Sequence, residues 1–222
     1  MTARVTLGRM QNPIRGFLHG GAAIASLVGL VLMIVRSAGS PKSLTGGLVF
    51  GIALMVMYTV SALYHSIPWQ ERSKLRMRRI DHSMIYLVVA GTFTPIAIAS
   101  LDGATLAVAL ATVWGLAITG IFLKVFHPNV ATWLSVTIQL VMGWSALVWM
   151  PAIYEDLGLA AVVLILAGGL SYTVGAIIYA MKRPWPFPRI FSYHEIFHVL
   201  VILGSALHFA AIYSIALPHL VR

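Results

Sequence analysis

The chain has 222 residues, of which 59% are hydrophobic and only 9% are charged, whereas an ordinary soluble domain carries about 25% charged residues. This composition excludes a water-soluble globule and requires long apolar segments that face lipid. The chain has no cysteine, which excludes disulfides and cysteine-ligated zinc or iron–sulfur sites. The basic residues behind the net charge of +9 lie in short loops between apolar runs, so they indicate membrane topology and no nucleic-acid partner.

Seven apolar runs approach the length of about 20 residues that a helix needs to cross a bilayer. We expect an all-α integral membrane protein with a single seven-helix transmembrane domain over residues 1–222, in which 1–15 form a short cytoplasmic segment. The predicted helices span about 16–35, 44–66, 80–100, 104–124, 131–150, 159–181 and 194–217. Proline, glycine and charged residues separate them, as is typical of loops.

The first run also has features of a secretory signal peptide. Arginines precede it and small residues at 37–39 follow it, which would suit cleavage. Its apolar core is longer than the about 7–15 residues of a signal peptide. We therefore interpret it as a retained helix.

Lysine and arginine accumulate at one end of the predicted helices. Arg36, Lys42 and Arg222 lie at the other end. The remaining twelve of the 15 lie at the first: Arg4, Arg9, Arg15, Arg72, Lys74, Arg76, Arg78, Arg79, Lys124, Lys182, Arg183 and Arg189. Because positive charge marks the cytoplasmic side, we expect the N-terminus in the cytoplasm and the C-terminus outside.

Ionisable side chains inside the spans are costly in a bilayer and are therefore candidates for function. In the predicted orientation, His65 ends the second helix near the cytoplasmic face and Asp81 begins the third helix there. His194 and His198 occupy the first turns of the seventh helix, and their i, i+4 spacing places both on one helical face. Three helices thus bring four ionisable residues to one depth.

Three neutral imidazoles at about 2.0–2.1 Å fill three corners of a zinc tetrahedron and leave the fourth open to water. We therefore predict zinc as the cofactor, held by His65, His194 and His198. Asp81 would bind the water or the metal directly, and Ser61, one turn from His65, would hydrogen-bond the water or a substrate carbonyl. Asp81 and Ser61 are thus the predicted catalytic residues.

Structural roles remain open for the same side chains. His65 alone is typical of an interfacial histidine that extends towards water. Asp81 is also placed to cap its helix or to pair with Arg78 or Arg79. A serine such as Ser61 in a membrane helix often bonds its own backbone.

The other histidines are weaker candidates. His82 points about 100° away from Asp81 and is predicted to lie outside the metal's own ligands. His208 lies about 15 Å along the helix beyond His198, too far to share the metal, so we expect a hydrogen-bonded core residue. His19 lies at the cytoplasmic end of the first helix and is weaker still. We assign no role to His127 and His219.

The segment His194-Glu195-Ile196-Phe197-His198 also matches H-E-x-x-H, in which two histidines bind zinc and the glutamate is the general base of a metalloprotease. An intramembrane metalloprotease is therefore an alternative. No gluzincin or metzincin continuation follows the motif. Glu195 turns about 100° from His194 and would equally pair with Arg189, so it is a weak candidate outside the metal's ligands.

Three motifs together resemble the hemolysin III related proteins, bacterial relatives of the progestin and adipoQ receptors. They are Ser61-Ala-Leu-Tyr-His65, Arg79-Ile80-Asp81-His82 running into Ala90-Gly91-Thr92-Phe93-Thr94-Pro95, and His194-Glu-Ile-Phe-His198. The resemblance covers nearly the whole chain. It implies a seven-helix protein of the bacterial cell membrane whose N-terminus is cytoplasmic. It also implies zinc held at His65, His194 and His198, with Asp81 acting through water and Ser61 nearby.

The wider superfamily includes alkaline ceramidases, so the resemblance implies zinc-dependent hydrolysis of a membrane-lipid amide or ester in lipid or fluidity homeostasis. Membrane lipids are accordingly the expected partners, and no protein partner is predicted. One alternative is a non-catalytic, receptor-like membrane sensor with structural zinc. Another is a pore-forming cytolysin, which the family's name implies, although no span shows the sustained polar stripe of an aqueous lumen.

Overall fold

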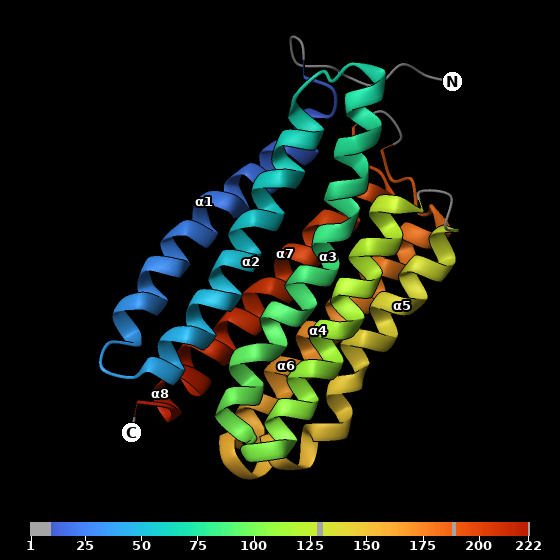
Figure 1. Cartoon of the computed structure of the whole chain (residues 1–222). Coiled ribbons are helices and arrows are strands. Elements are labelled where there is room, and N and C mark those ends of the chain that lie inside the picture. Colours follow the sequence, from blue (N-terminus) through green and yellow to red (C-terminus); the bar gives the residue numbers. More distant parts are fainter. Residues whose placement is uncertain (1–9, 128–130, 188–189, 222) are drawn as a thin grey trace.

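In the computed structural model, which describes residues 10–127, 131–187 and 190–221, the helices run side by side in one elongated bundle (Figure 1). A 3₁₀ segment, Ser145–Trp149, leads into α6, and a π-helical segment, Ile212–Ala216, follows α7. The α-helices are α1 Pro13–Arg36, α2 Pro41–Ser66, α3 Glu71–Ser100, α4 Gly103–Phe126, α5 Thr132–Trp144, α6 Met150–Met181, α7 Tyr193–Ala211 and α8 Leu217–His219.

Local sequence explains where the helices begin. Pro13 and Pro41 are the first residues of α1 and α2, because the fixed φ of proline suits a first turn that has no hydrogen-bond partner for its N–H. α3 begins at Glu71, earlier than the predicted start near residue 80. The apolar pattern marks only the part of a helix that lies in lipid, so it does not register the charged turns that continue α3 beyond it.

Six helical segments of the described chain are long and apolar enough to cross a membrane. One of them, Trp133–Met181, has 49 residues, about twice the length needed for one crossing. Gly158 interrupts it with φ 77° and ψ 177°, a conformation open to glycine because it has no Cβ. α5, which precedes Gly158, and the part of α6 that follows Gly158 lie side by side (Figure 1), and Trp144 Nε1 of α5 donates to Thr173 Oγ1 of α6 at 3.0 Å.

Large apolar side chains cover much of the outer surface. Ile24 and Val35 on α1 are 69% and 70% exposed, and Ile118 on α4 is 63% exposed. Soluble monomers rarely present apolar surface on this scale, so it marks contact with lipid. Together with the six apolar segments, this surface is that of a multi-pass membrane protein.

Two clusters of buried side chains hold the bundle together. One, around Met33, Phe50 and Ile212, joins α1 and α2 to the end of α7, and the other, around Tyr86 and Met142, joins α3 to α4 and α5. α7 packs against both α1 and α6 and runs through the middle of the bundle (Figure 1). This position brings the first turns of α7 next to the first turns of α1 and the last turn of α2.

Candidate metal centre

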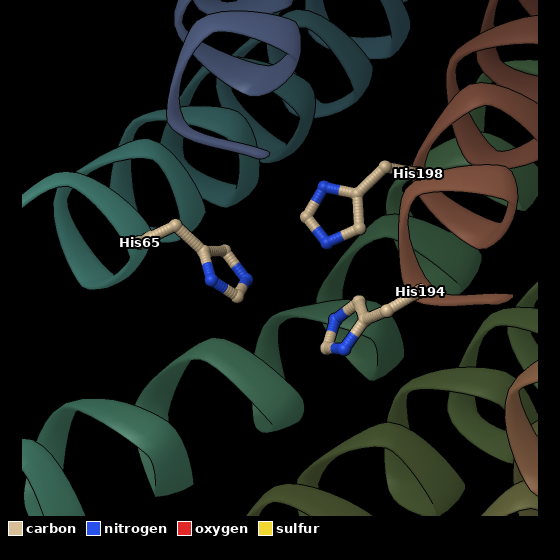
Figure 2. Close-up of side chains that lie close together, drawn as sticks. All are labelled: His65, His194 and His198. Carbon is tan, nitrogen blue, oxygen red and sulfur yellow. The ribbon is translucent and has the colours of Figure 1, made fainter. Parts of the chain in front are cut away.

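Three histidines from two helices converge at one end of the bundle (Figure 2). His65 lies in the last turn of α2, and His194 and His198 lie in the first turns of α7. One ligand atom of each lies within 4.8 Å of those of the other two. His65 and His198 are only 2% and 1% exposed, and His194 is half-buried. This cluster could bind a metal ion.

The donor set fits a small nitrogen-binding ion. A tetrahedral ion with bonds of about 2.0–2.1 Å holds its ligand nitrogens about 3.4 Å apart. The ring centroids are 5.3 Å apart for His65 and His194 and 4.9 Å apart for the other two pairs. Modest side-chain rotations would therefore bring the three nitrogens onto one ion. The cluster offers only imidazole nitrogens, whereas calcium and magnesium prefer oxygen ligands.

Asp81 and Ser61 lie beside this cluster. They line a cavity of about 70 Å³ together with His194 and His198. The Ser61 hydroxyl is within hydrogen-bonding reach of the Asp81 carboxylate, and Ser61 is 3% exposed. The five residues predicted as ligands or catalytic groups thus lie at one end of the bundle, and their chemical roles stay predictions.

His82 also lines the cavity, with Nε2 4.0 Å from Asp81 Oδ2. It lies next to this carboxylate and is not part of the three-histidine cluster. His208 is also outside the cluster. Its Nε2 lies 3.2 Å from the Ile165 carbonyl oxygen, as expected for a hydrogen-bonded core residue.

Comparison with known proteins places the histidine motifs in a family. The model of the family described as "Haemolysin-III related" matches residues 8–209, which include every residue of the cluster. The chain belongs to the Haemolysin-III related family. The resemblance predicted from the three motifs is therefore confirmed.

Relatives of this chain within and beyond the bacteria align over most of their length. The chain is 35% identical to "Hemolysin-3" of Bacillus cereus over 202 residues, covering 90% of this chain and 89% of that protein. It is 35% identical to "Hemolysin-3 homolog" of Bacillus subtilis over 206 residues, covering 91% and 93%. It is 22% identical to "Monocyte to macrophage differentiation factor" of Homo sapiens over 206 residues, covering 89% and 81%.

Glu195 turns back towards its own helix. Its Oε2 accepts from the Ser192 backbone N–H at 2.7 Å and from the Ser192 hydroxyl at 2.6 Å. Its Oε1 accepts from Arg15 Nε on α1 at 2.7 Å. The carboxylate therefore caps the start of α7 and ties it to α1, and it is not among the residues that line the cavity beside the histidines.

Sequence reasoning underrated two basic side chains at this end of the bundle. His19 on α1 is 3% exposed, and its ring centroid lies 3.8 Å from that of His198. Lys124, at the end of α4, lines the same cavity as Asp81. Both lie at the cytoplasmic ends of their predicted helices, so the depth argument that selected His65 would also have selected them.

A second, apolar cavity of about 140 Å³ adjoins the first. It lies among α3, α5, α6 and α7, and Trp144, Leu147 and Ile165 are typical of its lining. The two cavities share Met57, Ile85, Gln139, Ala176, Phe197 and Val201. The space beside the histidines therefore neighbours an apolar space inside the bundle.

Proposed function

We propose that this protein is a zinc-dependent hydrolase of a membrane-lipid amide or ester, with zinc held by His65, His194 and His198. The observation that carries the proposal is the three-histidine cluster beside a cavity that Asp81 and Ser61 also line. Three imidazoles leave one position of a tetrahedral ion open, as in catalytic zinc sites, whereas structural sites use four protein ligands. Zinc, when bound, would polarise a water molecule and the carbonyl of the substrate.

The neighbouring residues supply the remaining chemistry. Asp81 accepts the proton of the attacking water, because its carboxylate faces the cavity next to the histidines. Ser61 has one hydroxyl hydrogen to donate: given to Asp81 it orients that carboxylate, and given to the carbonyl oxygen it stabilises the negative charge that develops there. His82 lies next to the same carboxylate, with Nε2 4.0 Å from Asp81 Oδ2.

The apolar cavity supports a lipid as the substrate and partner. Its volume of about 140 Å³ and its apolar lining suit a section of hydrocarbon chain. Because the two cavities share residues, a chain lying there would present its carbonyl towards the histidines. Hydrolysis of such a lipid would alter the composition of the bilayer, which is the basis for a role in lipid or fluidity homeostasis.

We also propose that the segment Trp133–Met181 crosses the membrane twice, which gives seven crossings. Its 49 residues, the break at Gly158 and the adjacent course of α5 and α6 support this topology. α1 begins and α8 ends at opposite ends of the bundle (Figure 1), as an odd number of crossings requires. The basic residues then orient the N-terminus to the cytoplasm and the C-terminus outward, in the plasma membrane of a bacterial cell.

Elemental analysis of detergent-purified protein tests the metal site. We expect about one zinc per chain in the wild type, none in His194→Ala, and an unchanged amount in the control His219→Ala, whose exposed side chain lies in α8. Lipid analysis of cells expressing His65→Ala or His198→Ala should show no turnover, although both variants insert normally. Absence of zinc from the wild type, or turnover in these variants, would reject the proposal.

A second candidate is a non-catalytic sensor in which zinc is structural. It is favoured by the position of the histidines on α2 and α7, because an ion there would join two helices from distant parts of the chain. This candidate predicts that a chelator lowers the melting temperature while no lipid product forms in any condition. An unchanged melting temperature after complete zinc removal would count against it.

A further inference from the structure

A lysine side chain, Lys124, lines the cavity beside the histidines. Lys124 belongs to the last turn of α4, and its Nζ donates to Ser135 Oγ on α5 at 3.1 Å. A lysine near the end of a membrane helix usually extends its ammonium outward to the interface. Here the ammonium is held inward, because Ser135 is only 5% exposed and both residues line the cavity.

The position of Ser135 is itself fixed by neighbouring helices. The Tyr86 hydroxyl of α3 donates to the Ser135 carbonyl oxygen at 3.3 Å, and Tyr86 is 2% exposed. A hydroxyl that accepts a hydrogen bond from Lys124 still has its own hydrogen to donate. Lys124 and Ser135 therefore present a preformed pair of donors towards the cavity.

The charge of Lys124 has no carboxylate partner among the described residues. The ion pairs in that part of the chain are Arg15–Glu195, Lys42–Asp102 and the pair of Asp81 with His82. Asp81 is the acidic residue in the described lining of the cavity. Its neighbours are His82 and Ser61, and it forms no ion pair with Lys124. A cation that is partly removed from water is costly unless an anion compensates it, so the cavity favours an anionic ligand.

The depth of Lys124 indicates which anion this is. The last turn of an apolar helix lies at the edge of the hydrocarbon core, next to the layer of lipid headgroups. In a glycerophospholipid the phosphate is separated from the acyl esters by only a few bonds. One lipid molecule would therefore place its phosphate at Lys124, an ester near the histidines and a chain in the adjoining apolar cavity.

We propose that Lys124 and Ser135 bind the phosphate of an anionic phospholipid, which makes this class of lipid the ligand of the cavity. The inference rests on the proposed function for the orientation of the ester towards the histidines. Its test measures binding alone, so it does not depend on turnover or on bound metal.

Phosphatidylglycerol is titrated into detergent-solubilised protein, and binding is measured by the rise in melting temperature, with phosphatidylcholine as the comparison lipid. The wild type should prefer phosphatidylglycerol, and Lys124→Met should bind it about tenfold more weakly, because a hydrogen bond to a charged group is lost. Lys74→Met is the matched control: it removes the same charge from an exposed position near the start of α3 and should leave the preference unchanged. Ser135→Ala, which keeps the cation, should weaken binding to a smaller extent, and Lys124→Arg should retain it.

Three results would overturn the proposal. If Lys124→Met keeps the preference, or Lys74→Met loses as much of it, the effect is a general attraction to a basic surface. If inorganic phosphate stabilises the wild type through Lys124 while phosphatidylglycerol does not, the ligand is free phosphate and not a lipid. Should Lys124→Met fail to fold, the other two variants test the proposal. It then requires that Lys124→Arg keep the preference for phosphatidylglycerol and that Ser135→Ala weaken it. Selective lipid binding without hydrolysis would reject the hydrolase and leave this inference in place.

Discussion

We expect the buried ion pair between α1 and α7 to contribute measurably to stability. Arg15 Nε and Glu195 Oε1 are 2.7 Å apart, and the two side chains are 8% and 4% exposed. Arg15→Met keeps much of the aliphatic stem but leaves the Glu195 carboxylate buried without this partner, which costs about 3–5 kcal/mol. In a chain of this size 1 kcal/mol shifts the melting temperature by about 2–4 °C, so we expect a decrease of roughly 6–20 °C.

The measurement is thermal unfolding in detergent, followed by the fluorescence of the six tryptophans. The matched control is Lys42→Met, which breaks a pair 3.8 Å apart whose side chains are 67% and 92% exposed and which should cost less than about 1 kcal/mol. The double variant Arg15→Met/Glu195→Gln should recover part of the loss, because no charge then remains buried there. An Arg15→Met shift no larger than that of Lys42→Met would refute the reasoning.

Two glycine positions give further predictions. Gly158→Ala should lower the stability by about 1–3 kcal/mol, because its φ of 77° is strained for other residues although the space around it is open; Gly143→Ala, also in open space, is the thermal-unfolding control. Gly168→Ala should cost a similar amount, about 1–3 kcal/mol, because a Cβ would lie 2.7 Å from His208 Nε2. Restored stability in Gly168→Ala/His208→Ala would identify that contact as the cause, whereas equal losses in the single and double variants would contradict it.

The sequence predicts much of the candidate site because depth in a membrane is readable from charge. Once the basic residues set an orientation, the ends of helices far apart in the sequence fall at the same level, and this places His65, Asp81 and His194 together. Rotation about each helix axis is not readable in this way. The inward course of Lys124 depends on Ser135 of the next helix, a partner that periodicity on α4 alone does not reveal.

The break in Trp133–Met181 shows a related limit. Glu155, Asp156 and Gly158 mark a loop in the sequence, and the helical geometry resumes immediately beyond Gly158. The sequence thus locates the change of chain direction, but it does not show how few residues make the turn. A single glycine with φ 77° takes the place of the short loop predicted between the fifth and sixth runs, so the helix before it continues beyond the predicted end of the fifth run near residue 150.

Glu195 of the H-E-x-x-H pattern has two candidate roles, the general base of a metalloprotease and a carboxylate that caps the start of α7. In the metalloproteases that carry it, the glutamate is the general base, whereas here the motif begins at the second residue of α7, which places Glu195 where a capping box puts its acidic residue. The sequence Ser192-Tyr193-His194-Glu195 is itself the S-x-x-E signature of that box, so this role was available from sequence. In the structure, the backbone N–H and the hydroxyl of Ser192 donate to Glu195 Oε2 at 2.7 and 2.6 Å, as this capping role requires.

Glu195→Gln separates the two roles, because glutamine also completes a capping box but does not act as a base. We expect it to retain zinc and lipid turnover and to lose stability through the weakened contact with Arg15. Asp81→Asn is the comparison: it should retain zinc and lose turnover by about 10²–10⁴-fold, the usual contribution of a general base. If Glu195→Gln instead loses that factor at full zinc content while Asp81→Asn does not, Glu195 is the base, and the metalloprotease hypothesis replaces the one proposed here.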